Sequence, residues 1–242
     1  MGEIAALFDI DGTLYREGLI SEIFKKLVKY EIIDSEKWYK DVKPEYVKWD
    51  KRQGNYDNYL LKMADIYLEA VKGLHVSQIE FIANKVVEQK GDRVYTYTRD
   101  MIRWHKNMGH KVITISGSPV ELVKAMAHRH GFHDYRGSIY EINDLNVYTG
   151  EVIPMWDSKN KKHAIEELAS IYDIDLGLSY AYGDTAGDFS MLEMVHYPVC
   201  VNPTKELLTK IINDETTSRK AQIIVERKDM VYRLTSQDIR NI

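Results

Sequence analysis

Short apolar runs alternate with longer amphipathic segments along most of this chain. The runs are residues 4–8, 111–116, 179–183 and 197–201, with 223–225 as a candidate fifth. Each run is apolar at neighbouring positions and not only at every second one, as expected of strands covered by helices on both faces. Alternating strands and helices indicate an α/β fold with a mainly parallel sheet.

Apolar residues recur at helical spacing between these runs. The expected helices cover residues 97–108, 120–129, 161–172 and 205–213. Gly109 and Gly131 follow the first two at positions that commonly end helices, and Thr204 is a candidate N-cap of the last. Residues 135–156 fit neither pattern, and we expect them to hold a further core strand and a short hairpin.

The stretch from about residue 16 to residue 93 interrupts the alternation. Apolar residues at helical spacing form one face over 20–28 and another over 59–70, and Ser77-Gln-Ile-Glu80 matches a capping box ahead of a third. No run here has the character of a strand. The pattern therefore predicts an all-helical subdomain, residues 16–93, inserted into an α/β core formed by residues 1–15 and 94–242.

Composition and charge exclude several classes of protein. The 242 residues contain 33 Lys and Arg against 37 Asp and Glu, a net charge of −4, so the basic excess of a nucleic-acid-binding domain is missing. No apolar run approaches the ~20 residues that span a bilayer, so we expect no membrane partner. The amino-terminal residues lack the basic segment of a secretory signal, and Cys200 is the only cysteine. These features predict a cytoplasmic protein without disulfides.

Polar residues follow the first two runs, at the sheet edge where α/β proteins bind ligands. Asp9 and Asp11 of Asp9-Ile-Asp11-Gly12 are two apart in an extended segment, so both carboxylates are expected to face one spot, where a cation or a proton would relieve their repulsion. An Asp-Gly turn is the alternative. Ser116 and Gly117 precede a helix, where a hydroxyl and an amide suit a phosphate oxygen or form an ordinary N-cap.

Charged residues also open the later helices. Lys159, Lys161 and Lys162 open one helix, although its amino end disfavours cations, so they indicate a bound anion or a solvated run of charge. Asp184 ends the third apolar run, and Asp188 lies four residues beyond it. The segment from Thr185 to Asp188 also matches a capping box, but Asp184 has no such structural explanation.

In this order the motifs resemble the haloacid-dehalogenase superfamily of phosphatases, in the branch that includes phosphoserine phosphatase. The matching pieces are 8–14, 113–119, Lys161, 182–192 and 201–203. The resemblance implies a Rossmann-like, mainly parallel sheet flanked by helices, with the inserted helical segment as a cap over the site. It also implies a Mg²⁺-dependent phosphomonoesterase that acts on a small phosphorylated metabolite.

The resemblance further implies a role for each site residue. Asp9 would attack phosphorus and form an aspartyl-phosphate, and Asp11 would act as acid and then base. Mg²⁺ would be held by Asp9, by the backbone carbonyl of Asp11 and by Asp184, with Asp188 orienting a metal-bound water or Lys161. The remaining implied group binds the phosphate oxygens: Ser116, Gly117 and Lys161.

The substrate and the type of transfer stay open at this point. Phosphoserine phosphatases carry a Glu after the first motif, whereas the register here places Gly18, with Glu17 beside it, which argues against phosphoserine. Aromatic residues of the helical segment either bind a cationic or ring-bearing alcohol phosphate or simply pack helices together: Trp38, Tyr39, Tyr46, Trp49, Tyr56 and Tyr59. A phosphotransferase or mutase, and a non-catalytic phosphometabolite-binding protein, are the alternatives to a phosphatase.

Overall fold

The computed structural model describes residues 2–54 and 56–239, without the side chains of residues 56 and 57. Its described part holds one eight-stranded sheet in the order β4-β3-β2-β1-β5-β6-β7-β8. The strands are β1 (Ala5–Phe8), β2 (Lys111–Pro119), β3 (Asp134–Ile142), β4 (Tyr148–Ile153), β5 (Tyr180–Gly183), β6 (Tyr197–Val201), β7 (Gln222–Arg227) and β8 (Met230–Thr235). The six inner strands of the sheet are parallel to one another. The two edge strands, β4 and β8, pair antiparallel with β3 and β7.

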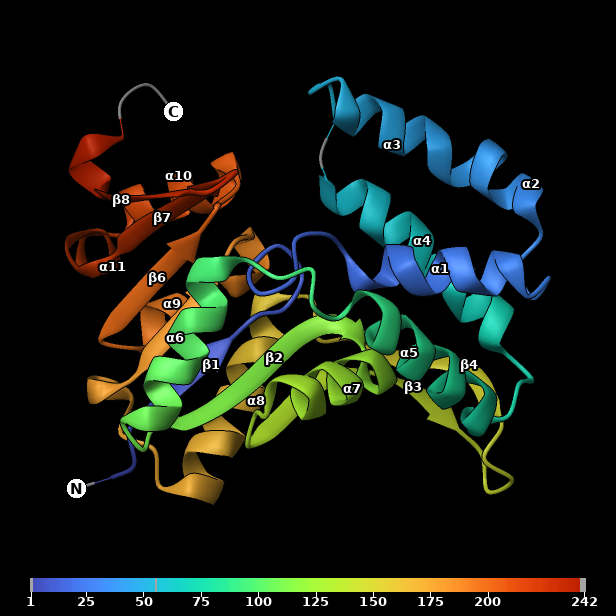
Figure 1. The fold of residues 1–242 in the computed structure, drawn as a ribbon, viewed down its shortest axis with the longest axis horizontal. Helices are drawn as coiled ribbons and strands as arrows, with labels where there is room; N and C mark the ends of the chain where they lie inside the picture. The colour runs from blue at the N-terminus through green and yellow to red at the C-terminus, as the bar shows by residue number, and fades with distance from the viewer. Residues whose placement is uncertain (1, 55, 240–242) are drawn as a thin grey trace.

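Helices cover both faces of the sheet, as the apolar runs predict. The core helices are α6 (Thr96–Asn107), α7 (Val120–His130), α8 (Ser158–Tyr172), α9 (Phe189–Met194), α10 (Lys205–Asn213) and α11 (Glu215–Lys220). In β1, Ala6 and Phe8 point into the cluster that includes α6 and α7, whereas Ala5 and Leu7 point into the cluster that includes α8, α9 and α10. Figure 1 shows α6 and α7 in front of the sheet and α8 behind it.

A group of helices lies between β1 and β2 in the chain. They are α1 (Leu19–Lys29), α2 (Ser35–Lys37), a π-helical turn over Trp38–Val42, α3 (Lys43–Asp50), α4 (Tyr56–Val71) and α5 (Val76–Lys90). Helix α5 packs against the core helix α7, and α1 packs against α4 and α5. In Figure 1, α1 to α4 lie at upper right, beyond the carboxyl end of β1.

Residues 135–156 form the expected core strand and hairpin. Strand β3 runs parallel to β2, and β4 returns antiparallel beside β3. One detail of the sequence prediction is wrong. The capping box of α5 is built on His75 and Gln78 and not on Ser77, because the helix already begins at Val76.

Candidate active site

The carboxyl ends of β1 and β5 bring three aspartates together. The two strands are neighbours, with Phe8 beside Tyr182, so Asp9 and Asp184 each follow directly at the same sheet edge. Asp188 completes the group from the turn after β5. One carboxylate oxygen from each of the three lies within 4.8 Å of the others, and all three side chains are buried.

The side chain of Lys161, from α8, extends into this group of aspartates. Its Nζ donates to Asp9 Oδ1 at 2.9 Å and to the Ile115 carbonyl at 3.2 Å, and it also contacts Asp188. The neighbouring lysines differ: Lys159 and Lys162 are both exposed, whereas Lys161 is buried. The solvated interpretation therefore fits Lys159 and Lys162, and the anion-facing interpretation fits Lys161.

The electrostatics of the group favour a bound cation. Burial raises the pKa of Asp9 well above its ordinary value, against the lowering effect of Lys161. Burial, followed by the charges of Asp188 and Asp9, also raises the pKa of Asp184. Burial alone would lower the pKa of Lys161, but Asp188 and Asp9 raise it, so the ammonium stays charged. One ammonium does not neutralise three carboxylates, and a divalent cation among their oxygens would.

Asp188 combines two functions that the sequence presents as alternatives. Its Oδ2 accepts from the backbone N–H groups of Asp184 at 3.0 Å and Thr185 at 2.9 Å, and the bond from Thr185 is part of the predicted capping box. Its Oδ1 faces Lys161. The same carboxylate therefore shapes the loop after β5 and holds the buried lysine.

Asp11 faces partners different from those of Asp9. Its Oδ2 accepts from Ser118 Oγ at 2.6 Å and Ser116 Oγ at 3.2 Å, and its Oδ1 accepts from the Leu19 N–H at 2.6 Å. Burial raises the pKa of Asp11, and these hydrogen bonds oppose that shift. The expectation that both carboxylates face one spot is therefore met only in part. Both line one cavity, but the Asp11 side chain is outside the group of three aspartates.

Ser118 is a site residue that the sequence prediction missed. Strand β2 continues beyond Ser116 to Pro119, and residues two apart on a strand face the same side. If the predicted strand over 111–116 is extended by two residues, Ser118 lies on the same side as Ser116, and this spacing identifies it as a site residue. Gly117 between them lies against Trp156, where an added Cβ would be 2.8 Å from the Trp156 Cβ.

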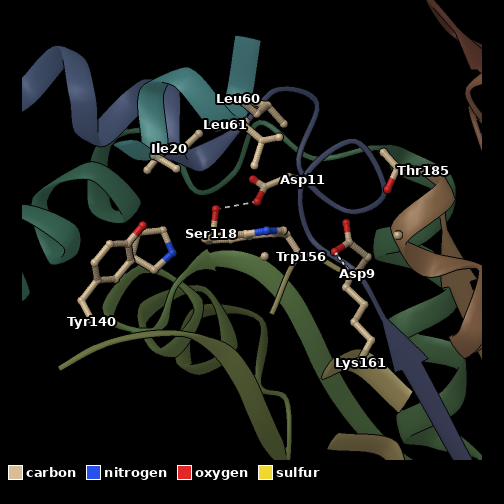
Figure 2. A pocket seen from close by; sticks show the side chains of 15 residues that line it. Asp9, Asp11, Ile20, Leu60, Leu61, Ser118, Tyr140, Trp156, Lys161 and Thr185 are labelled. Carbon is tan, nitrogen blue, oxygen red and sulfur yellow. Dashed lines mark hydrogen bonds and ion pairs between the residues drawn. The ribbon is translucent and has the colours of Figure 1, made fainter. Parts of the chain in front are cut away.

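A cavity of about 180 Å³ opens above these residues (Figure 2). Asp9, Asp11, Ser118 and Lys161 lie on its core side, together with Gly117, Pro119, Tyr140, Trp156, Thr185 and Gly187. Residues between β1 and β2 form the other side: Gly18, Ile20, Leu60, Leu61 and Ala64. Figure 2 shows Ile20, Leu60 and Leu61 across the cavity from Trp156.

The structure also places the residues considered for substrate binding. Gly18 lines the cavity, whereas Glu17 is exposed and pairs with Arg93 at 2.7 Å. Several of the aromatic residues pack against one another, as in the pairs Trp38–Tyr46 and Tyr46–Tyr59, and none of those with described side chains lines the cavity. The side chain of Tyr56 lies outside the described part. These contacts favour the helix-packing interpretation.

The chain matches a known protein family over most of its length. A family model described as haloacid dehalogenase-like hydrolase matches residues 6–193. The "Inhibition of morphological differentiation protein" of Streptomyces azureus is 28% identical over 205 residues, which cover 84% of this chain and 73% of that protein. Phosphoserine phosphatase SerB1 of Mycobacterium tuberculosis is 27% identical over 142 residues, 58% of this chain and 46% of that protein. The chain thus spans about half the length of this mycobacterial relative.

Solved structures show the same fold. A Bordetella pertussis protein of unknown function matches with a TM-score of 0.73 at 18% identity, over 92% of this chain and 98% of that one. A phosphoserine phosphatase with a phospho-aspartyl intermediate analogue matches with a TM-score of 0.59 at 22% identity, over 95% and 96%. Among the described residues, no helix is long and apolar enough to cross a membrane. From the family match over residues 6–193, together with this fold, the chain belongs to the haloacid dehalogenase-like hydrolases.

Proposed function

We propose that this protein is a Mg²⁺-dependent phosphomonoesterase that acts on a small phosphorylated metabolite through an aspartyl-phosphate. The observation that carries the proposal is the buried contact between Lys161 and Asp9, at the floor of a cavity beside the acidic group. The relatives named Phosphoserine phosphatase SerB1 and Probable phosphatase Rv3661 support the same class of reaction. In this proposal residues 16–93 are the cap and residues 1–15 with 94–242 are the catalytic core.

The residues present fit a magnesium ion. Asp9 and Asp184 offer hard carboxylate oxygens close together, in a buried group whose negative charge exceeds that of its single ammonium. The backbone carbonyl of Asp11 would be a third ligand, and Asp188 would act through a water or through Lys161. When bound, the ion neutralises phosphate charge and orients the phosphoryl group for attack.

The chain's own residues account for the steps of hydrolysis. A carboxylate oxygen of Asp9 attacks phosphorus, the bond from phosphorus to the ester oxygen breaks, and Asp11 gives its proton to the departing alcohol. Asp11 then takes a proton from water, whose oxygen attacks the aspartyl-phosphate and releases inorganic phosphate and the Asp9 carboxylate. Lys161, Ser116 and the Gly117 amide hold the phosphoryl oxygens meanwhile.

The test is hydrolysis of para-nitrophenyl phosphate with and without Mg²⁺. We expect turnover that EDTA abolishes, that Mg²⁺ restores, and that Asp9→Asn lowers by at least about 10³-fold. Asp184→Asn should lose the response to Mg²⁺, whereas Asp144→Asn, an exposed aspartate of the β3–β4 turn, should not. Turnover unaffected by both Asp9→Asn and EDTA would contradict the mechanism.

Two further measurements separate the alternatives. Acid quenching followed by peptide mass spectrometry should find one phosphoryl group on Asp9 and none in the Asp9→Asn variant. Adding an alcohol acceptor should leave the yield of inorganic phosphate unchanged. A new phosphate ester would indicate a phosphotransferase, and binding of phosphate esters without any turnover would indicate a binding protein. We also propose a cytoplasmic location, with which the buried, unpaired thiol of Cys200 is consistent.

A further inference from the structure

The cavity has two chemically different halves. The charged residues that line it are Asp9, Asp11 and Lys161, within the described part of the chain. Each already has a function at the phosphate end: Lys161 holds Asp9, and Asp11 is held by Ser116, Ser118 and the Leu19 N–H. Among the described residues, no charge of the cavity wall is therefore left to pair with a charge on the alcohol part of a substrate.

The half that faces the alcohol is apolar. One side of helix α4 contributes Leu60, Leu61 and Ala64 to the cavity. Ala64 lies four residues after Leu60 and three after Leu61, and residues at these spacings share a helix face. Ile20 of α1 extends this wall, and the rings of Tyr140 and Trp156 lie on the core side. Figure 2 shows the aliphatic side chains and the two rings around the same space.

The core side of this wall is fixed by tight packing. Trp156 lies between two glycines. A Cβ on Gly117 would be 2.8 Å from the Trp156 Cβ, and a Cβ on Gly187 would be 2.5 Å from the Trp156 carbonyl oxygen. Tyr140 is 4% exposed and its ring meets that of Tyr67 edge to face, with centroids 4.8 Å apart. The backbone and Cβ of Trp156 and the ring of Tyr140 are therefore held in place, and a wall of this kind presents a preformed apolar surface to a ligand.

We propose that the alcohol part of the substrate is uncharged and apolar, and that Ile20, Leu60, Leu61, Ala64, Tyr140 and Trp156 form its binding site. This proposal rests on the proposed phosphatase function and specifies its substrate class. A zwitterion such as phosphoserine would bury an ammonium and a carboxylate against this wall without partners, which is unfavourable. An alkyl or aryl group would instead exchange water for apolar contact.

The test compares alkyl phosphates that share one leaving-group chemistry. Propyl phosphate and phosphoethanolamine have the same number of heavy atoms and differ by one methyl in place of one ammonium. We expect kcat/KM to be at least about tenfold higher for propyl phosphate. From ethyl to butyl phosphate, kcat/KM should rise by up to about fourfold for each methylene that the wall buries.

Two variants with the same substitution show whether the wall is responsible. Leu61 is 43% exposed and lines the cavity, whereas Leu178 is 41% exposed and precedes β5 at the opposite sheet edge. Leu61→Glu should lower kcat/KM for butyl phosphate at least about tenfold and reduce the preference over phosphoethanolamine. Leu178→Glu should change neither value. If Leu61→Glu fails to fold, Leu61→Gln gives the same comparison without a charge.

Non-hydrolysable ligands separate this proposal from the proposed reaction. Calorimetric titration of the Mg²⁺-loaded protein with butylphosphonate and with 3-aminopropylphosphonate should show tighter binding of butylphosphonate. That preference without turnover of any ester would support the apolar site and contradict the phosphatase function. Turnover with equal or better use of phosphoethanolamine would overturn the apolar site and leave the phosphatase function intact. Neither binding nor turnover would overturn both.

Discussion

The ammonium of Lys161 lies 2.9 Å from Asp9 Oδ1, although 152 residues separate the two in the chain. Both side chains are almost inaccessible, at 3% and 7% exposed. Contacts to Asp188 and to the Ile115 carbonyl hold the ammonium from other sides. The lysine is therefore a fixed positive charge beside the proposed nucleophile and is not free to move into solvent.

Replacing Lys161 tests this relationship. In Lys161→Met we expect kcat for para-nitrophenyl phosphate to fall by about 10²- to 10³-fold, because a preorganised charge at the phosphoryl group is lost. The unpaired carboxylates should also lower the free energy of unfolding by about 3–5 kcal/mol, measured by urea titration. Lys162→Met, an exposed neighbour in the same helix, should change neither value. Equal loss in both variants would show that the helix and not the contact is responsible.

The sequence is enough to predict that Asp9 and Asp184 lie together, because the carboxyl ends of parallel strands all lie at one edge of the sheet. Once Asp9 and Asp184 each follow an apolar parallel strand, neighbouring strands bring them to one edge whatever lies between them in the chain. The same reasoning could not orient Asp11, because its direction depends on hydrogen bonds from Ser118 and Leu19, two residues that join it only in the folded protein.

Two elements of the fold, α11 and β8, are not predicted from the sequence because their local hydrophobic patterns are weak. Helix α11 over Glu215–Lys220 has the sequence Glu-Thr-Thr-Ser-Arg-Lys, with no apolar stripe, and it begins at the Asp214 cap and is held by packing. Strand β8 over Met230–Thr235 is almost entirely exposed, so it lacks the two-sided apolar pattern of the other strands. It forms because it pairs along the whole of β7, which a local pattern does not reveal.

Ser118 is expected to position Asp11 for proton transfer to the leaving group. Ser118→Ala removes the 2.6 Å hydrogen bond to Asp11, so kcat/KM for an alkyl phosphate should fall by about tenfold, the effect of about 1.4 kcal/mol. For para-nitrophenyl phosphate kcat/KM should change little, because its leaving group departs without a proton and kcat/KM covers only the steps up to that departure. A purely structural role would lower both values together.

Ser116→Ala is the matched comparison. Ser116 also bonds Asp11, at the longer distance of 3.2 Å, but we place it on the phosphoryl oxygens, which both substrates share. The variant should therefore lower kcat/KM for the alkyl and the aryl ester by similar factors. If Ser118→Ala behaves in the same way as Ser116→Ala, the assignment of Ser118 to Asp11 is wrong.

Glu121 in the first turn of α7 is expected to make stability depend on pH. Burial raises its pKa, and although Tyr148 donates to its Oε1 at 2.8 Å, its Oε2 has no hydrogen-bond partner among the described residues. The nearby charges of Glu80 and Lys124 have smaller, opposing effects on this pKa. A raised pKa in the folded state means that the stabilisation is present below the ordinary pKa of Glu and is lost as pH rises through the folded value.

Glu121→Gln should therefore be more stable than the natural protein at pH 8, by about 1 kcal/mol, with a smaller difference or none near pH 5. The amide keeps an acceptor for Tyr148 and removes the buried charge. Urea unfolding at the two pH values measures the difference, and Glu151→Gln on the exposed face of β4 is the control. If the Glu121→Gln variant loses stability more steeply than the natural protein between pH 5 and pH 8, this account is wrong.

Gly12 is expected to control the affinity for Mg²⁺ through Asp184. Its φ of +85° favours glycine, and a Cβ there would lie 2.0 Å from Asp184 Oδ2. Gly109 has a similar φ of +77°, but a Cβ there would meet nothing within 4 Å.

Alanine at either position should cost about 1–2 kcal/mol of backbone strain. Only Gly12→Ala should also displace Asp184 and weaken the apparent Mg²⁺ affinity by about 10- to 100-fold, as when a residue that supports a metal ligand is changed. Mg²⁺ titrations of activity and of thermal stability measure this, and equal Mg²⁺ dependence in the two variants would rule out Asp184 as a ligand held by this turn.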